Sequence, residues 1–466
     1  MNTVRIPGGA REDSSSVHRS WWVLGVMCAG MFLVLLDVTV VNVALPSIGG
    51  ALGAGPGAVQ WVVDAYAVAI AALLLGGGAV SDRMGHRRVV LAGLALFGVA
   101  SAGCALAPGS ETLVAARAAQ GAGAALLLPG SLAVISDTFP DRAARARALG
   151  VWAGVSSLAL PAGPLLGGLL VQSGGWRLIF WINVPVVAAA SAAVRRLVSD
   201  DGGRAAGRTD WAGAGSAALT LAAVVFAVID MGHHGPRPLG VCAGIVAVMA
   251  GGGFVLRERR ASAPMLPLVL LRTPAFAGPH VAALVMNMVA NGTLFVVTYY
   301  LQTVQHRSAP AAGVALLPLF VPLAVLAPVA GRLTARHGPR LPLLVGGCAA
   351  ACGCVALLLL RADSGVPALL PGLVGLGVGT GLSTAAVVAA AVGAVPADRS
   401  GLASGVNNAS RQTGTALGVA VFGAVAGSPR DPEAFTAGVR HLGVLGAALW
   451  VVALVVTVRT VPRRHI

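Results

Sequence analysis

Residues 158–168 read LALPAGPLLGG and lie within an apolar run, residues 151–172, that contains no charged side chain. Three small residues of the stretch recur every four positions and therefore share one face of a helix: Ala159, Gly163 and Gly167. Such a smooth face lets a second helix approach closely, as in helix pairs inside lipid bilayers. Pro161 and Pro164 each remove a backbone hydrogen-bond donor, so we expect the helix to bend there. The stretch predicts a kinked membrane helix in close contact with a neighbour.

The composition of the whole chain predicts an all-α polytopic membrane protein. Of its 466 residues, 56% are hydrophobic and only 11% are charged, whereas soluble proteins carry about a quarter charged residues. Apolar runs of about 18 residues or more recur along the chain, and their continuity excludes a β-barrel, whose strands alternate. We expect fourteen transmembrane helices, over residues 21–44, 58–79, 88–107, 112–136, 147–171, 177–197, 211–231, 239–256, 276–301, 311–331, 341–360, 366–394, 403–426 and 438–458.

The charge of the chain bears on its orientation. Its formal net charge is +15, and every basic residue is Arg, because the sequence contains no Lys. A chain this basic also fits a nucleic-acid-binding protein, but in a membrane protein the positive charge normally lies in cytoplasmic segments. With the fourteen spans above, segments on the side of the N-terminus hold about four times as many Arg residues as the opposite side. This asymmetry predicts two cytoplasmic termini, and the absence of Lys excludes a Walker A ATPase.

An internal repeat divides the chain into two halves. Residues 78–87, GAVSDRMGHR, align with residues 331–340, GRLTARHGPR, so that Gly, Arg, Gly and Arg coincide at an offset of 253 residues. Each copy follows the second span of its half, which indicates two six-helix bundles with two helices inserted between them. We therefore expect a disordered cytoplasmic tail (1–20), an N-terminal bundle (21–197), a two-helix insertion with flanking loops (198–272), and a C-terminal bundle with a short basic tail (273–466).

Asp37, Asp64 and Arg117 are ionisable side chains that lie within the predicted spans of the N-terminal half. An ionised side chain at the centre of a membrane helix costs about 2.5–3.5 kcal/mol on insertion scales, so each should face protein or water. Burial favours the neutral form of a carboxyl group, which suits both acids to proton coupling, and a buried guanidinium needs an acidic partner. The residues leave open which acid pairs with Arg117. They also leave open whether Asp64 belongs to an interfacial belt with Trp61, and whether Asp37 or Arg117 reaches water from a helix end.

Further polar and aromatic residues within the spans are candidates to line a substrate cavity. Several lie one helical turn from another candidate, as Gln120 does from Arg117, so that they share a helix face. Trp61 offers an aromatic wall for a cation or a flat ring. The candidates are Asn42, Trp61, Tyr66, Gln120, Asn287, Asn291, Asn407 and Arg411. Helix packing explains Asn407 and Arg411 equally well.

The first copy of the repeat is a candidate latch for one conformation of the protein. Gly85 permits a tight turn, and Asp82 can bind a helix N-terminus or an Arg side chain. The second copy has Ala335 in place of Asp82, so we assign the latch to the first copy alone: Gly78, Asp82, Arg83, Gly85 and Arg87. Basic charge that fixes membrane topology is the alternative explanation for its Arg residues.

Residues 159–168 resemble the antiporter motif of exporters in the major facilitator superfamily, Gly-x-x-x-Gly-Pro-x-x-Gly-Gly. Ala159 replaces the first Gly, and the remainder of the pattern is intact. The resemblance assigns this motif to Pro161, Gly163, Pro164, Gly167 and Gly168.

Other segments resemble the 14-span drug:proton antiporter family of that superfamily. Residues 36–46, LDVTVVNVALP, resemble its first-span signature, and residues 117–123, RAAQGAG, its fourth-span motif, in which the Arg assists proton transfer. Residues 78–88 resemble the loop motif of the superfamily, and residues 61–66, WVVDAY, are similar to the methylenomycin-resistance type of pump. The resemblance implies a major facilitator fold of fourteen helices, arranged as six, two and six in two pseudo-symmetric bundles.

From these residues and the resemblance we expect a proton-coupled exporter of amphipathic or cationic drugs that works by alternating access. The alternatives are a proton-coupled uptake symporter for a nutrient and a membrane sensor without transport. We expect no enzymatic activity, no cofactor, no metal and no nucleic-acid partner, and the proton gradient as the energy source. The expected partners are a small molecule, protons and the lipid bilayer of the cell membrane, with the monomer as the functional unit.

Overall fold

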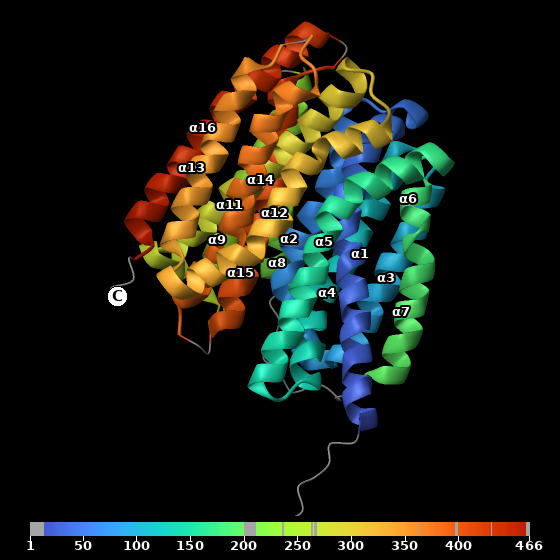
Figure 1. Cartoon of the computed structure of the whole chain (residues 1–466), viewed down its shortest axis with the longest axis vertical. Helices are drawn as coiled ribbons and strands as arrows, with labels where there is room; N and C mark the ends of the chain where they lie inside the picture. Colours follow the sequence, from blue (N-terminus) through green and yellow to red (C-terminus); the bar gives the residue numbers. More distant parts are fainter. Residues whose placement is uncertain are drawn as a thin grey trace, which may run out of the picture.

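The described residues form an all-helical structure in which two bundles stand side by side (Figure 1). The computed structural model describes residues 14–199, 211–234, 237–261, 264, 268–361, 363–396, 399–429 and 431–462. The N-terminal bundle consists of α1 (Ser14–Leu52), α2 (Pro56–Met84), α3 (His86–Leu106), α4 (Ser110–Thr138), α5 (Arg142–Gly174), α6 (Leu178–Trp181) and α7 (Asn183–Leu197).

The C-terminal bundle repeats this order of helices. It consists of α11 (Pro274–Tyr299), continued by the π-helix η1 (Tyr300–Val304), then α12 (Ala309–His337), α13 (Arg340–Ala356) with the short η2 (Leu357–Leu359), η3 (Val366–Leu369) leading into α14 (Leu370–Gly393), α15 (Ser400–Ala426) and α16 (Pro432–Thr460). Between the bundles the chain forms α8 (Trp211–His234), α9 (Pro238–Arg260) and the short α10 (Leu268–Leu271).

The helices confirm the predicted membrane architecture. In the described part of the chain, twelve helices are long and apolar enough to cross a membrane. Helices α5 and α15 are also long, with 33 and 27 residues, and they complete the fourteen predicted spans. Asp141, Ser308 and Asp431 accept backbone N–H groups at the first turns of α5, α12 and α16, so side-chain caps fix where these helices begin.

Several helices extend beyond the boundaries that the sequence predicts for them. Residues 14–20, predicted to be an irregular tail, form the first turns of α1, while residues 1–13 lie outside the described part. Helix α1 runs on to Leu52, and α2 runs on to Met84 through most of the segment predicted as a loop. The apolar pattern marks the part of a helix that lies in lipid. Backbone hydrogen bonds continue a helix beyond that part, so the pattern underestimates its length.

The internal repeat is also present in the backbone conformation. The described residues with positive φ form three pairs separated by 253, 253 and 252 positions: Gly53 and His306, Gly85 and Gly338, and Gly175 and Gly427. At Gly85 and Gly338 the chain turns between two helices with φ of 90° and 80°, a conformation that glycine adopts without strain. The prediction of a tight turn at Gly85 is therefore confirmed.

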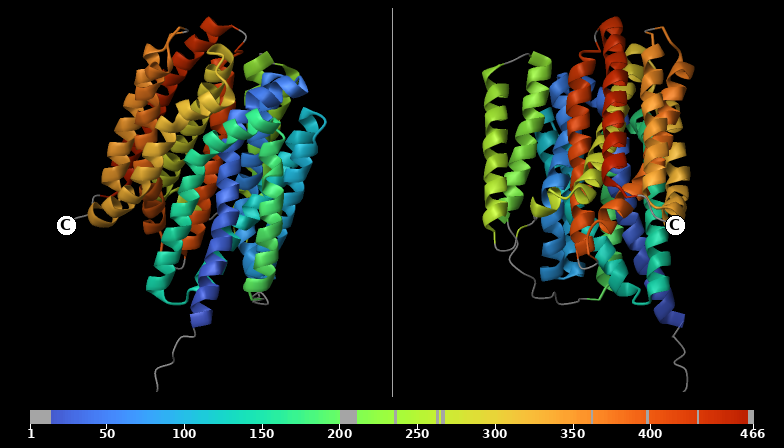
Figure 2. Two further views of the ribbon diagram at one scale, coloured as in Figure 1. Left: turned by 45° about the vertical axis from the view of Figure 1, so that its right-hand side comes forward. Right: turned by 90° about the vertical axis from the view of Figure 1, so that its left-hand side faces the viewer.

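The packing of helices repeats as well. In the N-terminal bundle α1 packs on α5, and both α2 and α3 pack on α4; in the C-terminal bundle α11 packs on α15, and both α12 and α13 pack on α14. The bundles meet through α5 against α12 and α2 against α15. Helices α8 and α9 form a pair at the side of the molecule, where α8 packs on both α2 and α15 (Figure 2).

The contacts between bundles lie at the end opposite to the beginning of α1. There Gln302 donates a hydrogen bond to the carbonyl of Val43 over 2.8 Å. A Cβ added at Gly168 of α5 would lie 2.6 Å from the Cα of Pro310 in α12, so the two backbones touch. Toward the end where α1 begins, the ribbons of the two bundles diverge (Figures 1 and 2).

Candidate functional site

An ion pair lies buried within the N-terminal bundle. Arg117 of α4 donates a hydrogen bond from its guanidinium to Oδ2 of Asp37 in α1. Both side chains are 1% exposed, which excludes the interpretation that either reaches water from a helix end. Arg117 also donates to the backbone carbonyl of Val62 over 2.8 Å and to Oε1 of Gln120 over 2.7 Å. The question left open by the sequence is thereby answered: the acidic partner of Arg117 is Asp37.

Polar side chains from three other helices surround the carboxylate. Gln120 donates from Nε2 to Oδ1 of Asp37 over 2.9 Å and to Oγ of Ser101 over 2.9 Å. Asn183 of α7 approaches the same two oxygen atoms at 3.3 and 3.4 Å. Because several hydrogen bonds satisfy the buried charges, the pair can persist in the apolar interior of the bundle. Asp37, Ser101, Arg117, Gln120 and Asn183 are called the N-bundle network below.

Two members of the N-bundle network escaped the sequence analysis. Ser101 is a small residue in an apolar run and carries no signal of its own. Asn183 is the single side-chain amide within the span 177–197, and an amide in the middle of such a run is a usable signal because it needs a hydrogen-bond partner.

Aromatic rings complete the surroundings of the guanidinium. The Cζ atom of Arg117 lies 4.2 Å from the ring centroid of Tyr66 and 5.9 Å from that of Phe180, distances at which a cation is attracted to an aromatic face. The hydroxyl of Tyr66 donates to the carbonyl of Val34 over 3.2 Å. Of the predicted cavity residues, Tyr66 and Gln120 thus belong to the environment of Arg117.

Asp64 lies in a different environment, at the seam between the bundles. It is 0% exposed, and neither carboxylate oxygen has a hydrogen-bond partner among the described residues. On the same face of α2, Gln60 packs against Gly423 of α15, and Val68 clusters with Ala420 of α15. Residues four apart share a helix face, so Asp64 lies on the face that α2 presents to α15. Its full burial excludes the interpretation as an interfacial acid in contact with water.

Trp61, the predicted aromatic wall, has an aromatic neighbour on one of the inserted helices. Its ring packs against Phe226 of α8, with ring centroids 6.3 Å apart. The contact belongs to a small apolar cluster in which α8 covers α2 and α15 together. Trp61 therefore helps to attach the inserted helix pair to the seam.

The segment 158–168 packs its glycines against two different helices. A Cβ at Gly163 would overlap Thr39 of α1, and one at Gly167 would lie 3.0 Å from the carbonyl oxygen of Val40. Gly168 faces the other bundle, as its close approach to Pro310 demonstrates, and the carbonyl of Pro164 faces Gly313 of α12. The prediction of close helix contact is therefore confirmed. The same helix contacts its own bundle and the opposite one.

The latch segment is described in part. The surroundings of Gly78 and the side chains of Asp82 and Arg83 lie outside the described part of the structure. Arg87 donates from a terminal guanidinium nitrogen to the carbonyl of Arg195, in the last turn of α7, over 2.6 Å. In the second copy Arg340 approaches the carbonyl of Val461, just after α16, at 3.4 Å.

The other predicted cavity residues make most of their described hydrogen bonds within their own helices. Asn42 and Asn287 each donate to the backbone carbonyl four residues earlier in their own helix, and Asn291 reaches Thr415 of α15 over 3.2 Å. Asn407 is 1% exposed, and neither its amide nitrogen nor its amide oxygen has a partner among the described residues. The same holds for Nε of Arg411, one turn further along α15. Among the described residues, no group of His, Cys, Asp and Glu side chains could hold a metal ion.

Two repeated bundles of membrane-crossing helices, with a buried ion pair in one and a buried acid between them, define a membrane transport protein. A sequence profile described as "Major Facilitator Superfamily" matches residues 27–419. The chain therefore belongs to the major facilitator superfamily.

Relatives with described roles extend over nearly the whole chain. It is 36% identical over 398 residues to "Multidrug resistance protein Stp" of Mycobacterium tuberculosis, an alignment that covers 85% of this chain and 74% of the relative. It is 36% identical over 426 residues to the "Tetracenomycin C resistance and export protein" of Streptomyces glaucescens, with coverage of 90% and 79%. A third relative, the "Methylenomycin A resistance protein" of Streptomyces coelicolor, is 34% identical over 446 residues, with coverage of 92% and 90%.

A solved structure shares the fold. A bacterial homologue of the human lysosomal transporter Spinster, crystallised in an inward-facing and occupied conformation, superposes with a TM-score of 0.68 at 16% sequence identity. The superposition covers 94% of this chain and 97% of that chain. The predicted major facilitator fold is thereby confirmed.

Proposed function

We propose that the protein is a proton-coupled exporter of amphipathic small molecules, of the kind represented by drugs and antibiotics. The proposal is supported by the relatives, whose names describe resistance and export, and by the antiporter motif on α5. It places the chain in the cell membrane with both termini in the cytoplasm, an orientation that the Arg asymmetry supports. The proton gradient supplies the energy, so the carrier needs no cofactor and no metal, and it catalyses no reaction.

In this orientation the two bundles diverge on the cytoplasmic side (Figures 1 and 2). The bundle contacts through Gln302 and Gly168 then lie on the outer side. A substrate enters between the bundles from the cytoplasm and leaves after the outer contacts have separated. Alternating access of this type is a rocking of one bundle against the other about a central site.

The two buried acids take different parts in the cycle. Asp64 lies where α2 meets α15, so the separation of these helices on the outer side brings its carboxyl into contact with external water. A buried carboxyl without a partner is far less costly when it carries its proton. Asp64 therefore takes up a proton from outside, closes the seam in the neutral form and releases the proton to the cytoplasm before the next cycle. Asp37 accepts hydrogen bonds from Arg117 and Gln120 of α4. Through these bonds it links the position of α1 to that of α4.

The observation that carries this assignment is the unpartnered burial of Asp64 between the bundles. It is tested with purified protein in liposomes, with ethidium movement and internal pH followed by fluorescence. We expect the wild type to move ethidium only with a pH difference and to move protons in the opposite direction. Asp64→Asn should lose both the proton flux and the dependence on pH difference. The matched control is Glu111→Gln, because Glu111 is an exposed acid at the beginning of α4.

Different outcomes separate the possible functions. Ethidium movement that is equally fast without a pH difference, or an Asp64→Asn variant coupled like the wild type, would contradict the proposal. Protons and a solute moving in the same direction would support an uptake symporter, and the absence of any flux would support a sensor. A drug-susceptibility profile of cells that express the protein then defines the range of substrates.

A further inference from the structure

A cavity lies within the N-terminal bundle, away from the N-bundle network. It has a volume of about 330 Å³ and opens where the beginnings of α1 and α3 meet the ends of α4 and α7. Its charged lining consists of Arg19, His86, Arg87 and Asp137. Asp137 lies 3.5 Å from His86, and the two guanidinium groups outweigh this single carboxylate, so the cavity presents a net positive charge.

Each guanidinium group is anchored by one hydrogen bond and keeps donors to spare. Arg19 donates from Nε to the carbonyl of Leu197 over 3.1 Å, and Arg87 donates to that of Arg195 over 2.6 Å. Both bonds satisfy carbonyl groups at the end of α7, which have no partner within the helix. The Nε–H of Arg87 is buried without a partner among the described residues. A guanidinium carries five N–H donors in a planar fork, the geometry that binds a phosphate oxygen pair.

The neighbouring aromatic residues place the cavity at the level of lipid headgroups. Trp21 and Trp22 follow directly on the lining residue Ser20 and are 46% and 67% exposed. Trp21 also packs edge-on against Phe139, directly after α4, with ring centroids 5.8 Å apart. Exposed Trp side chains of a membrane protein gather at the boundary between acyl chains and headgroups. The cavity is therefore situated where a phosphate of the surrounding leaflet can enter it.

We propose that this cavity binds the headgroup of an anionic phospholipid, with its phosphodiester held between Arg19 and Arg87. The two fixed positive charges supply the attraction, as in other basic pockets between membrane helices. The bound lipid links the first helix of the bundle to the end of its last helix. The proposal depends on the membrane location of the protein and is independent of what it transports.

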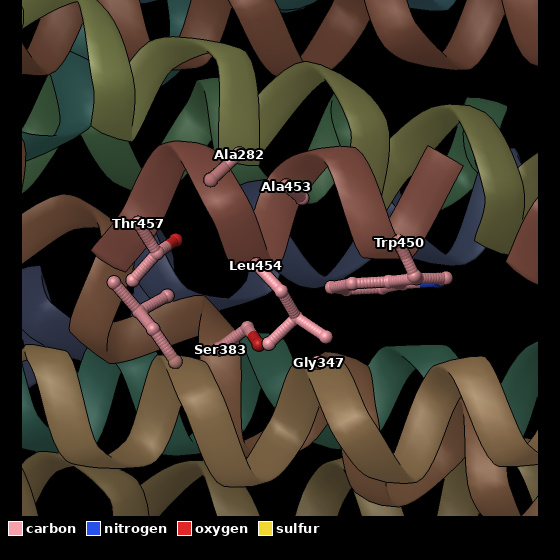
Figure 3. Close-up of a pocket in the computed structure, with 8 residues that line it drawn as sticks. Ala282, Gly347, Ser383, Trp450, Ala453, Leu454 and Thr457 are labelled. Atoms are coloured by element: carbon pink, nitrogen blue, oxygen red, sulfur yellow. The ribbon is translucent and has the colours of Figure 1, made fainter. Parts of the chain in front are cut away.

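The C-terminal bundle provides a natural comparison. Between the corresponding helices α11, α13, α14 and α16, a cavity of about 10 Å³ lies among Ala282, Gly347, Trp450 and their neighbours (Figure 3). Its lining is apolar except for small hydroxyl groups such as those of Ser383 and Thr457. A headgroup does not fit there. Arg340, which matches Arg87 in the repeat, still approaches the carbonyl after the last helix of its bundle.

The experiment titrates the purified full-length protein in detergent with phosphatidylglycerol or phosphatidylcholine. Native mass spectrometry counts bound lipid, and the melting temperature reports its effect. We expect phosphatidylglycerol to bind and to raise the melting temperature, and phosphatidylcholine to do neither at the same concentration. Arg87→Gln and Arg19→Gln should each weaken phosphatidylglycerol binding about tenfold, the effect of one lost hydrogen bond to a charged group. Arg340→Gln is the matched control and should leave binding within about twofold of the wild type.

The other outcomes each overturn the proposal in a recognisable way. Equal loss of binding in Arg340→Gln and Arg87→Gln would show that surface charge alone attracts the lipid. Unchanged binding in both Arg19→Gln and Arg87→Gln would place the lipid elsewhere. An equal rise in melting temperature with inorganic phosphate at the concentration of the lipid would assign the cavity to a soluble anion. Arg19 is exposed, so its variant still tests the cavity if Arg87→Gln fails to fold.

Discussion

The two bundles share one helix plan but bury different chemistry at matching positions. In the N-terminal bundle, Asp37, Ser101 and Asn183 meet between α1, α3 and α7. In the C-terminal bundle the matching helices α11, α13 and α16 bring together Val289, Cys354 and Gly446. A Cβ on Gly446 would lie 2.8 Å from Sγ of Cys354 and 3.3 Å from Cγ1 of Val289. Cys354 stands 253 residues after Ser101, the offset of the repeat, and Leu373 stands at the same offset from Gln120.

This difference separates what the fold requires from what the function requires. An apolar cluster fills the same space between the same helices, so a buried ion pair is not needed to hold such a bundle together. Buried ion pairs contribute little net stability, because desolvation offsets their attraction. The N-bundle network is therefore best explained by a task that needs charge in the membrane, and that task is confined to one bundle.

The largest effect is expected from removing one partner of the ion pair. Arg117→Met leaves Asp37 buried without its counter-charge, and a buried charge that loses its partner destabilises a protein by about 3–5 kcal/mol. The double variant Asp37→Asn/Arg117→Met should be more stable than Arg117→Met, because no uncompensated charge remains. Thermal melting of the purified proteins in detergent measures both effects.

The C-terminal bundle supplies the control for this measurement. Leu373→Met changes the position that matches Gln120 and nearly conserves volume, so we expect a loss below about 1.5 kcal/mol. If the double variant melts below Arg117→Met by as much as Asp37→Asn alone melts below the wild type, the two residues act independently. In that case the ion pair would not distinguish the N-terminal bundle from the C-terminal bundle.

A second prediction concerns the point where the bundles touch. Gly168→Ala places a methyl group against the backbone of Pro310 across the seam, and overpacking of this kind costs about 1–3 kcal/mol. Because only the closed outer contact is affected, we expect the variant to populate the outward-open state more than the wild type. Gly154→Ala on the same helix meets no atom within 4 Å and should leave this equilibrium unchanged.

The distance between the outer ends of the bundles measures this equilibrium. Spin labels on Glu111→Cys and Asp363→Cys, in a background without native cysteines, report that distance directly, since both positions are exposed. Only in Gly168→Ala do we expect a larger fraction of molecules with a longer distance between the two labels. An identical distance distribution in all three proteins would show that α5 does not control the seam.

The sequence predicts the fold well because membrane spans and repeats are local patterns. Fourteen apolar runs and the two copies of the turn at Gly85 and Gly338 required no knowledge of distant contacts. Helix ends were predicted too early, as at Leu52 of α1, because hydropathy reports the lipid environment and not the backbone hydrogen bonds.

The sequence predicted individual residues of the site but not the contacts between them. Charge in an apolar span identified Asp37, Asp64 and Arg117, but their partners depend on how helices about 50 to 80 residues apart in sequence approach each other. The sequence therefore left the Asp37–Arg117 pair undecided and missed Ser101 and Asn183. It also gave no sign of the contact between Trp61 and α8, since nothing in the span reveals which helix lies beside it.

The smallest expected effect comes from exchanging the two matching residues Ser101 and Cys354. Ser101→Cys replaces the hydroxyl oxygen that accepts hydrogen bonds from Gln120 and Asn183, and a thiol is a weak acceptor. We expect a loss of about 1–2 kcal/mol, the usual effect of leaving buried donors unsatisfied, with slower transport at an unchanged pH difference. Cys354→Ser puts a hydroxyl into the apolar counterpart, where it can bond to its own helix backbone. Its transport should equal that of the wild type, whereas equal slowing by both exchanges would mean that the two bundles carry the proton-linked task together.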